Sequence, residues 1–131
     1  MAQPKPKIFE YTVEYDTDGT ASIPGGTSFL PPAGWTADHL LLTALVRCSL
    51  QSLAYHASHA GSTVRGSGSA TGRVTKRATD GRYAFVEIDC RIEAKLDPPL
   101  ADTHGLTARA ERDCFIGSSL TVAPRYDWRL T

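Results

Sequence analysis

The alternation of apolar and polar side chains predicts where the strands of this chain lie. Between Ile8 and Tyr15, apolar or aromatic residues alternate with polar ones. A period of two is typical of a half-buried strand. Two shorter strands, 20–23 and 27–30, are expected on either side of a Pro-Gly-Gly turn. A small sheet is therefore predicted near the N-terminus, after a loose tail over residues 1–6.

A long helix is predicted next. Thr36 is a natural N-cap residue, and Asp38 in the first turn complements the positive end of the helix dipole. The apolar run 40–46 within the helix is much too short to span a membrane. We expect the helix to continue to about Ala60 and to stop at Gly61.

A long hairpin is predicted in the second half of the chain. Residues 64–70 are rich in Ser and Gly and predict a loop, so the first strand is expected at 70–78. The second strand, 82–96, alternates apolar and charged side chains. Its inward stripe contains Cys90, which is therefore predicted to be a small, inert, buried side chain.

The buried face selects the register of this hairpin. A loop of three residues, with Gly81 in the left-handed conformation, sets Val86 opposite Val74 and Cys90 opposite Ala70. A two-residue turn would instead place charge on the buried face. The three-residue loop is therefore predicted.

The remaining elements complete an α+β order. Short helices are expected at 103–113 and 114–120, followed by a closing strand at 121–130. One long helix then has to cover two small sheets, and the first sheet has little helix of its own chain. We therefore expect a second copy of the chain to supply the missing cover.

Composition limits the classes of function. The chain has 14 basic and 14 acidic side chains, so it lacks the basic excess that nucleic-acid binding requires. The first residues are positively charged, but no apolar stretch follows them, so no signal peptide is predicted. A cytoplasmic location is expected, with neither nucleic acid nor membrane as a partner. In a reducing cytosol the three cysteines are expected to be free, catalytic or redox-cycling.

Cys48 and Cys114 are the candidate reactive thiols. Only a thiolate attacks a peroxide or a disulfide, so a reactive cysteine needs groups that stabilise its charged form. Cys114 can gain this from the start of a helix, although Asp113 beside it acts in the opposite sense. Cys48 lies about three turns inside its helix and needs a cation and a hydrogen-bond acceptor from elsewhere. From these residues alone, Cys114 is the more activated thiol and Cys48 is a core residue.

No metal or cofactor site is predicted. His56 and His59 have a spacing that can hold a metal, but no cysteine or carboxylate lies near them in sequence. Histidines at a helix C-terminus more often interact with the last carbonyl groups. The sequence contains no glycine-rich phosphate loop, G-x-S-x-G or H-E-x-x-H motif.

Two cysteine-centred blocks resemble the OsmC/Ohr family, the osmotically inducible protein C and organic hydroperoxide resistance proteins. The first, residues 36–48, is Thr-Ala-Asp-His-Leu-Leu-Leu-Thr-Ala-Leu-Val-Arg-Cys, similar to the family's T-x-P-E-x-L-x-x-A-x-x-x-C. The second, residues 110–120, is Ala-Glu-Arg-Asp-Cys-Phe-Ile-Gly-Ser-Ser-Leu, similar to A-E-x-x-C-P-x-S-x-x-L. The order of elements also matches across essentially the whole chain.

The resemblance implies a single OsmC-like domain over residues 1–131, with two small antiparallel sheets around a long central helix. It also implies an intertwined homodimer with two sites at its interface. The implied chemistry is that of a thiol peroxidase without a cofactor. Cys48 attacks an organic hydroperoxide and becomes a sulfenic acid, Cys114 resolves it as a disulfide, and an external dithiol restores both thiols. This order of roles reverses the ranking from the residues alone.

Three positions depart from the family pattern. The family's activating glutamate falls on Asp38, which is one methylene shorter. Residues 1–46 contain no arginine, whereas the family has one in the N-terminal strand-turn region. Phe115 replaces the proline after the second cysteine. The alternatives are therefore an OsmC-like protein without strong peroxidase activity that binds a small apolar or electrophilic ligand at the dimer cleft, and a structural fold with incidental cysteines.

Overall fold

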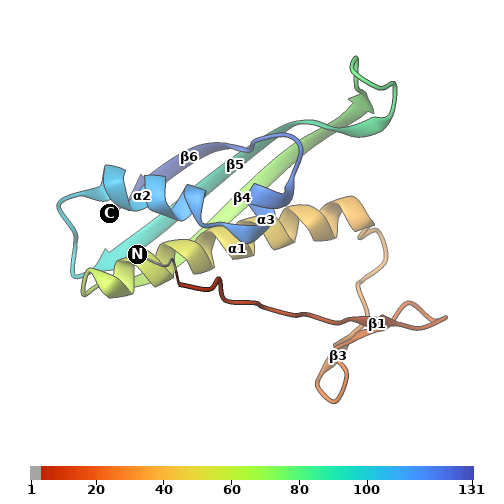
Figure 1. Ribbon diagram of the computed structural model, residues 1–131, viewed down its shortest axis with the longest axis horizontal. Coiled ribbons are helices and arrows are strands. Elements are labelled where there is room, and N and C mark those ends of the chain that lie inside the picture. The colour runs from red at the N-terminus through yellow and green to blue at the C-terminus, as the bar shows by residue number, and fades with distance from the viewer. Residues whose placement is uncertain (1–3) are drawn as a thin grey trace. The chain divides into compact units, whose positions relative to one another are not determined.

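The computed structural model describes residues 4–131 and divides at residue 35 into two compact units (Figure 1). Residues 1–3 of the predicted tail lie outside the described residues, and residues 4–6 have no regular secondary structure. Within residues 4–131, no helix has both the length and the apolar character that a bilayer span requires.

The N-terminal unit contains a sheet of three very short antiparallel strands. These are β1 (Glu14–Tyr15), β2 (Ala21–Ser22) and β3 (Ser28–Phe29), in that order. The two later strands confirm the prediction, but the strand expected over 8–15 is reduced to β1, and its apolar side chains are exposed rather than half-buried. Among the described residues of this unit, regular strand structure begins only at Glu14.

The C-terminal unit begins with the long helix α1 (Ala37–His59), whose bounds confirm the prediction. Thr36 and His39 form a reciprocal cap. The backbone N–H of His39 donates to Thr36 Oγ1 at 3.4 Å, and the backbone N–H of Thr36 donates to His39 Nδ1 at 3.1 Å. Gly61 ends the helix at a φ of +80°, a conformation that a side chain would strain.

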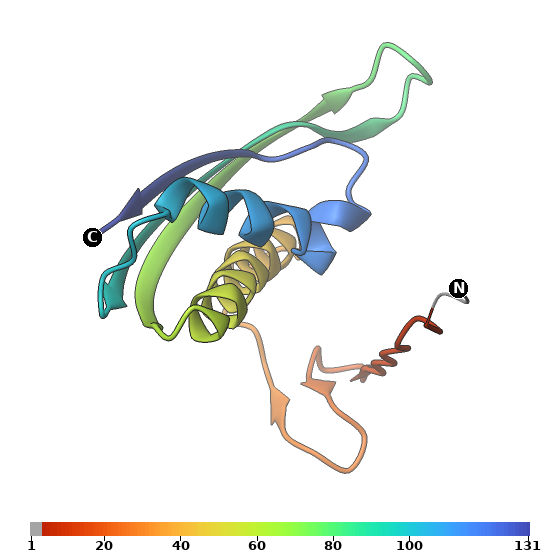
Figure 2. The ribbon, with the colours of Figure 1, turned by 60° about the vertical axis from the view of Figure 1, so that its left-hand side comes forward.

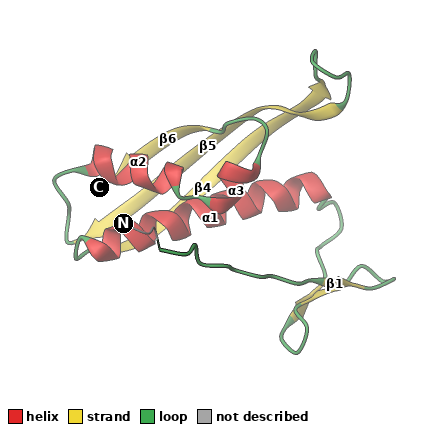
Figure 3. Cartoon of the chain, in the orientation of Figure 1, coloured by secondary structure: helices red, strands yellow, loops and turns green. Residues whose placement is uncertain are grey.

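A long antiparallel hairpin of β4 (Thr63–Lys76) and β5 (Tyr83–Asp97) follows (Figure 3). The predicted loop at 64–70 is wrong, because this stretch is the first half of β4 and is paired along its length. Small residues are needed there since α1 packs closely on the strand. A Cβ atom on Gly68 would lie 2.9 Å from Val46 Cγ1 of that helix.

The predicted register holds over most of the hairpin and changes near its tip. Ala70 pairs with Cys90 as expected. A β-bulge then sets Val74 opposite Phe85 instead of Val86, which is the extra residue of β5. Phe85 therefore replaces Val86 in the buried cluster. The alternating pattern of the sequence did not reveal this inserted residue.

Two short helices and a last strand complete the second unit. They are α2 (Thr103–Arg112), α3 (Phe115–Ser119) and β6 (Arg125–Leu130). The helices confirm the prediction, whereas β6 starts four residues later than the expected 121–130. The helices also form a crossover, so β6 runs parallel to β5 and the sheet β4-β5-β6 is mixed. The prediction of two antiparallel sheets is therefore wrong for this sheet.

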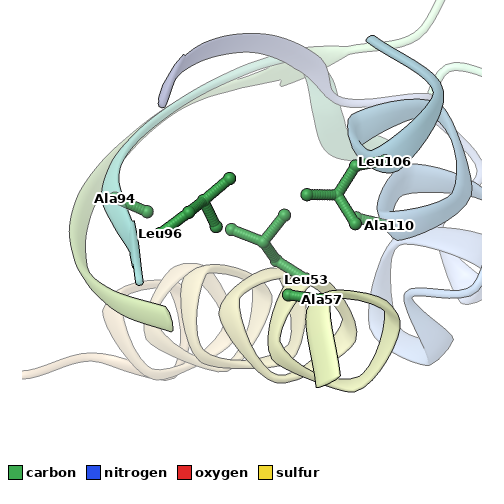
Figure 4. Close-up of a cluster of buried hydrophobic side chains, with 6 residues drawn as sticks. All are labelled: Leu53, Ala57, Ala94, Leu96, Leu106 and Ala110. Carbon is green, nitrogen blue, oxygen red and sulfur yellow. The ribbon is translucent and has the colours of Figure 1, made fainter. Parts of the chain in front are cut away.

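The helices lie on one face of the mixed sheet (Figure 2). Two apolar clusters are buried in this unit. The first cluster joins α1, α2 and β5 and is drawn in Figure 4; its buried members are Leu53, Ala57, Ala94, Leu96, Leu106 and Ala110. The second contains the buried residues Leu45, Ile88 and Cys114, with partly buried side chains packed against them, including those of Cys48 and Phe85. The cysteines of both sequence blocks therefore lie in one cluster, which we call the thiol cluster.

Candidate functional site

The structure brings together Cys48 and Cys114, which are 66 positions apart in the sequence. Cys48 is half-buried on α1, and Cys114 is fully buried as the N-cap residue of α3. Both thiols are free. Because α3 packs on α1, the N-cap position places the second thiol against the first.

Some of the groups around Cys48 raise the pKa of its thiol and others lower it. Burial raises the pKa of the Cys48 thiol, and the neighbouring Cys114 thiol raises this pKa further. Backbone N–H groups of Ile116 and Phe115 oppose the rise, since hydrogen bonds to sulfur favour the thiolate. None of the largest influences on this thiol is a cationic side chain from the described part of the chain.

These backbone donors were missed by the sequence reasoning. It placed Cys48 too deep in its own helix to reach any helix N-terminus. The structure supplies such donors from α3, which begins at Phe115 directly after Cys114. The predicted start of a second helix at Cys114 was one signal, and only the family resemblance, which implies a Cys48–Cys114 disulfide, placed this start near Cys48.

Cys114 is held by contacts from two elements. The backbone N–H of Gly117 donates to Cys114 Sγ at 3.4 Å, which caps the first turn of α3. On the other side, Ser49 Oγ of α1 lies 3.7 Å from the same sulfur. Ser49 is fully buried and also lies 2.9 Å from the hydroxyl of Tyr126 on β6. Neither Ser49 nor Tyr126 was identified as a candidate site residue from the sequence.

An ionic network anchors the residue before Cys114. Asp113 Oδ2 lies 2.7 Å from His56 Nε2 and 2.9 Å from Arg112 Nη2. Arg112 is the main cause that lowers the pKa of Asp113 to about 2, and His56 contributes to the same shift. The Asp113 carboxylate, which was expected to destabilise a Cys114 thiolate, is therefore paired with the side chains of His56 and Arg112.

Asp38 is not brought to Cys48 within one chain. Its side chain is exposed in the first turn of α1, ten residues before the cysteine. A helix rises about 1.5 Å per residue, so roughly 15 Å separates the two positions along the axis. Asp38 can therefore act on a Cys48 thiol only if it comes from a second copy of the chain.

Cys90 lies where the sequence predicted, on the inward face of β5. Its side chain is buried, and burial raises the pKa of its thiol to about 11. Such a thiol is almost fully protonated at neutral pH. Across residues 4–131 there is also no group of three or more His, Cys, Asp or Glu side chains that could hold a metal ion.

Comparison with solved structures identifies the fold. An OsmC-like protein from Mycoplasma pneumoniae matches with a TM-score of 0.72 and 19% identity, over 97% of this chain and 99% of that one. An OsmC-like protein of unknown function from Vibrio cholerae matches with a TM-score of 0.72 and 16% identity, over 84% and 82% of the two chains. The organic hydroperoxide resistance protein OhrB of Bacillus subtilis matches with a TM-score of 0.60 and 14% identity, over 93% and 96%.

No family model and no curated protein matches the sequence. The structural likeness nevertheless extends over nearly the whole chain, and it confirms the OsmC/Ohr fold that the two cysteine-centred blocks predicted. The chain therefore has the OsmC/Ohr fold, with Cys48 and Cys114 gathered in its thiol cluster.

Proposed function

We propose that this protein is a thiol-dependent hydroperoxide reductase in which Cys48 attacks the peroxide and Cys114 resolves the product. The observation that carries the proposal is the thiol cluster itself. It packs a half-buried thiol against a second thiol and turns two backbone N–H groups of α3 toward the first. Cys48 is the more exposed of the two, so it is the one that a substrate reaches first.

The reaction follows from these positions. The Cys48 thiolate attacks one oxygen of the hydroperoxide, the O–O bond breaks, and the departing alkoxide takes a proton to leave as an alcohol. Cys48 is then a sulfenic acid. Cys114 attacks this sulfur and releases water, which leaves a Cys48–Cys114 disulfide. An external dithiol reduces the disulfide by thiol exchange.

The proposal includes a homodimer. Tyr11, Val13 and Tyr15 of the N-terminal unit are 81%, 66% and 74% exposed, and such a row of large apolar side chains marks an interaction surface. The distance between Asp38 and Cys48 along α1 gives a second reason. A site that uses both groups has to take them from two chains.

A second candidate is an OsmC-like protein that binds a small apolar or electrophilic ligand and has little peroxidase activity. The raised pKa of Cys48 favours it, because a mostly protonated thiol reacts slowly with peroxide at neutral pH. The absence of arginine from residues 1–46 favours it as well.

Anaerobic titration of the reduced protein with cumene hydroperoxide distinguishes the two candidates. The reductase should consume one equivalent of peroxide per chain at neutral pH, and mass mapping should find a Cys48–Cys114 disulfide. A Cys48→Ser variant should consume none, and Cys90→Ala is the matched control that should behave like the unmodified protein. Peroxide consumption without this disulfide, or none at neutral pH, would count against the reductase.

A further inference from the structure

A pair of hydroxyl groups beside Cys114 has no part in the chemistry described so far. Ser49 Oγ lies 2.9 Å from the Tyr126 hydroxyl and 3.7 Å from Cys114 Sγ. Tyr126 is itself held in place, because its ring stacks on Trp128 with a centroid distance of 5.1 Å. The indole N–H of Trp128 in turn donates to Glu111 of α2 at 2.7 Å.

The number of donors and acceptors on Ser49 determines which group donates in each of its hydrogen bonds. A serine hydroxyl has one proton and two lone pairs. Ser49 Oγ donates its proton to the carbonyl oxygen of Leu45 at 2.7 Å, a group that can only accept. Both lone pairs are then left to accept, one from the Tyr126 hydroxyl and one from the Cys114 thiol. Burial raises the pKa of Tyr126, so its hydroxyl keeps the proton that it donates.

The Cys114 sulfur is consequently oriented from two sides. Its S–H bond is directed at Ser49 of α1, and the backbone N–H of Gly117 donates to it from within α3. The sulfur is therefore kept beside Cys48.

We propose that Ser49 and Tyr126 are positioning residues for the step in which Cys114 forms the disulfide. The inference rests on the proposed function, because it assigns a role within the same thiol cluster. A lone pair of the Cys114 sulfur forms the S–S bond with the Cys48 sulfenic acid, and the S–O bond breaks. Cys114 gives up its proton as it attacks, so that its thiolate is the nucleophile, and the departing oxygen takes up a proton and leaves as water; Cys114 is oxidised while the Cys48 sulfur is reduced. Ser49 holds the attacking thiol, and Tyr126 acts on it through Ser49 and through its own contact with the Cys114 side chain.

The test uses dithionitrobenzoate, an aromatic disulfide that needs no peroxidase activity. Attack by Cys48 releases one thionitrobenzoate and leaves a mixed disulfide, and attack by Cys114 then releases a second. Tyr126→Phe keeps the ring and removes only the hydroxyl. It should slow the second release about tenfold, as expected for one lost hydrogen bond, and leave the first unchanged. Ser49→Ala should slow the second release at least as much.

Ser52→Ala is the matched control. Ser52 is a buried serine on the same helix, but its Oγ donates to the carbonyl of Ala110. Both releases should keep their rates in this variant. The double variant Ser49→Ala/Tyr126→Phe should slow the second release by less than the product of the two single effects, because both hydroxyls belong to one network around the Cys114 sulfur.

Two results would overturn the inference in different ways. An unchanged second release in Ser49→Ala and Tyr126→Phe, or equal slowing in Ser52→Ala, would remove the positioning role and leave the proposed function intact. A single release in the unmodified protein, with no Cys48–Cys114 disulfide found by mass mapping, would remove the resolving role of Cys114 as well.

Discussion

At the scale of single residues, the environment of Cys48 predicts a pH dependence. Burial raises the pKa of its thiol, so the reactive thiolate is a minor species at pH 7 and its fraction grows as the pH rises. In a Cys114→Ser variant, the rate at which cumene hydroperoxide consumes the Cys48 thiol should therefore still increase between pH 8 and pH 9.

In the Cys48→Ser/Cys114→Ser double variant only Cys90 remains, so its rate of thiol loss is the background to be subtracted. A rate that reaches its plateau by pH 6.5 would contradict this prediction. It would show that a cation outside the described environment of Cys48 holds the thiolate.

Cys90 carries a second prediction at this scale. Its buried side chain packs on the inner face of β5, and its pKa of about 11 leaves almost no thiolate. Cys90→Ala should cost about 1–2 kcal/mol of unfolding free energy through lost packing. Turnover of hydroperoxide should stay unchanged. A folded Cys90→Ala protein that has lost its turnover would show that this thiol takes part in the chemistry.

At the scale of elements, the contact between α1 and β4 depends on small residues. A Cβ atom on Gly68 would lie 2.8 Å from the carbonyl oxygen of Arg91 and 2.9 Å from side chains of Ile92 and Val46. Gly68→Ala should therefore lower the unfolding free energy by about 1–3 kcal/mol, the usual cost of overpacking. Urea unfolding at one protein concentration measures the change. Ser69→Ala, on an exposed neighbour, is the control and should have little effect.

The helices and strands differ in how well they could be predicted from the sequence. The caps and periodicity of α1, α2 and α3 are local, so Thr36 and Gly61 marked the ends of α1 correctly. The first half of β4 was missed because its glycines are explained only by a helix from elsewhere in the chain. The bulge at Val86 and the hydrogen bonds of Ser49 likewise depend on partners distant in sequence.

At the scale of the whole molecule, the exposed apolar side chains of the N-terminal unit predict a dimer. That unit has no helix among its described residues, and burying such side chains is worth about 25 cal/mol for each Å² removed from water. Analytical ultracentrifugation should give about twice the chain mass of 14.1 kDa. A Tyr11→Glu variant should shift the equilibrium toward monomer. A well-folded monomer at micromolar concentration in the unmodified protein would contradict the prediction.

The proximity of Cys48 and Cys114 in the thiol cluster also affects how quickly the protein is degraded in the cell. A disulfide between them would close a loop over about half of the chain and restrict its unfolded forms, which favours the folded state by roughly 4 kcal/mol. Proteases cleave the opened chain, so the oxidised form should be degraded more slowly than the reduced one. Exposure to peroxide would then increase the abundance of the protein without new synthesis.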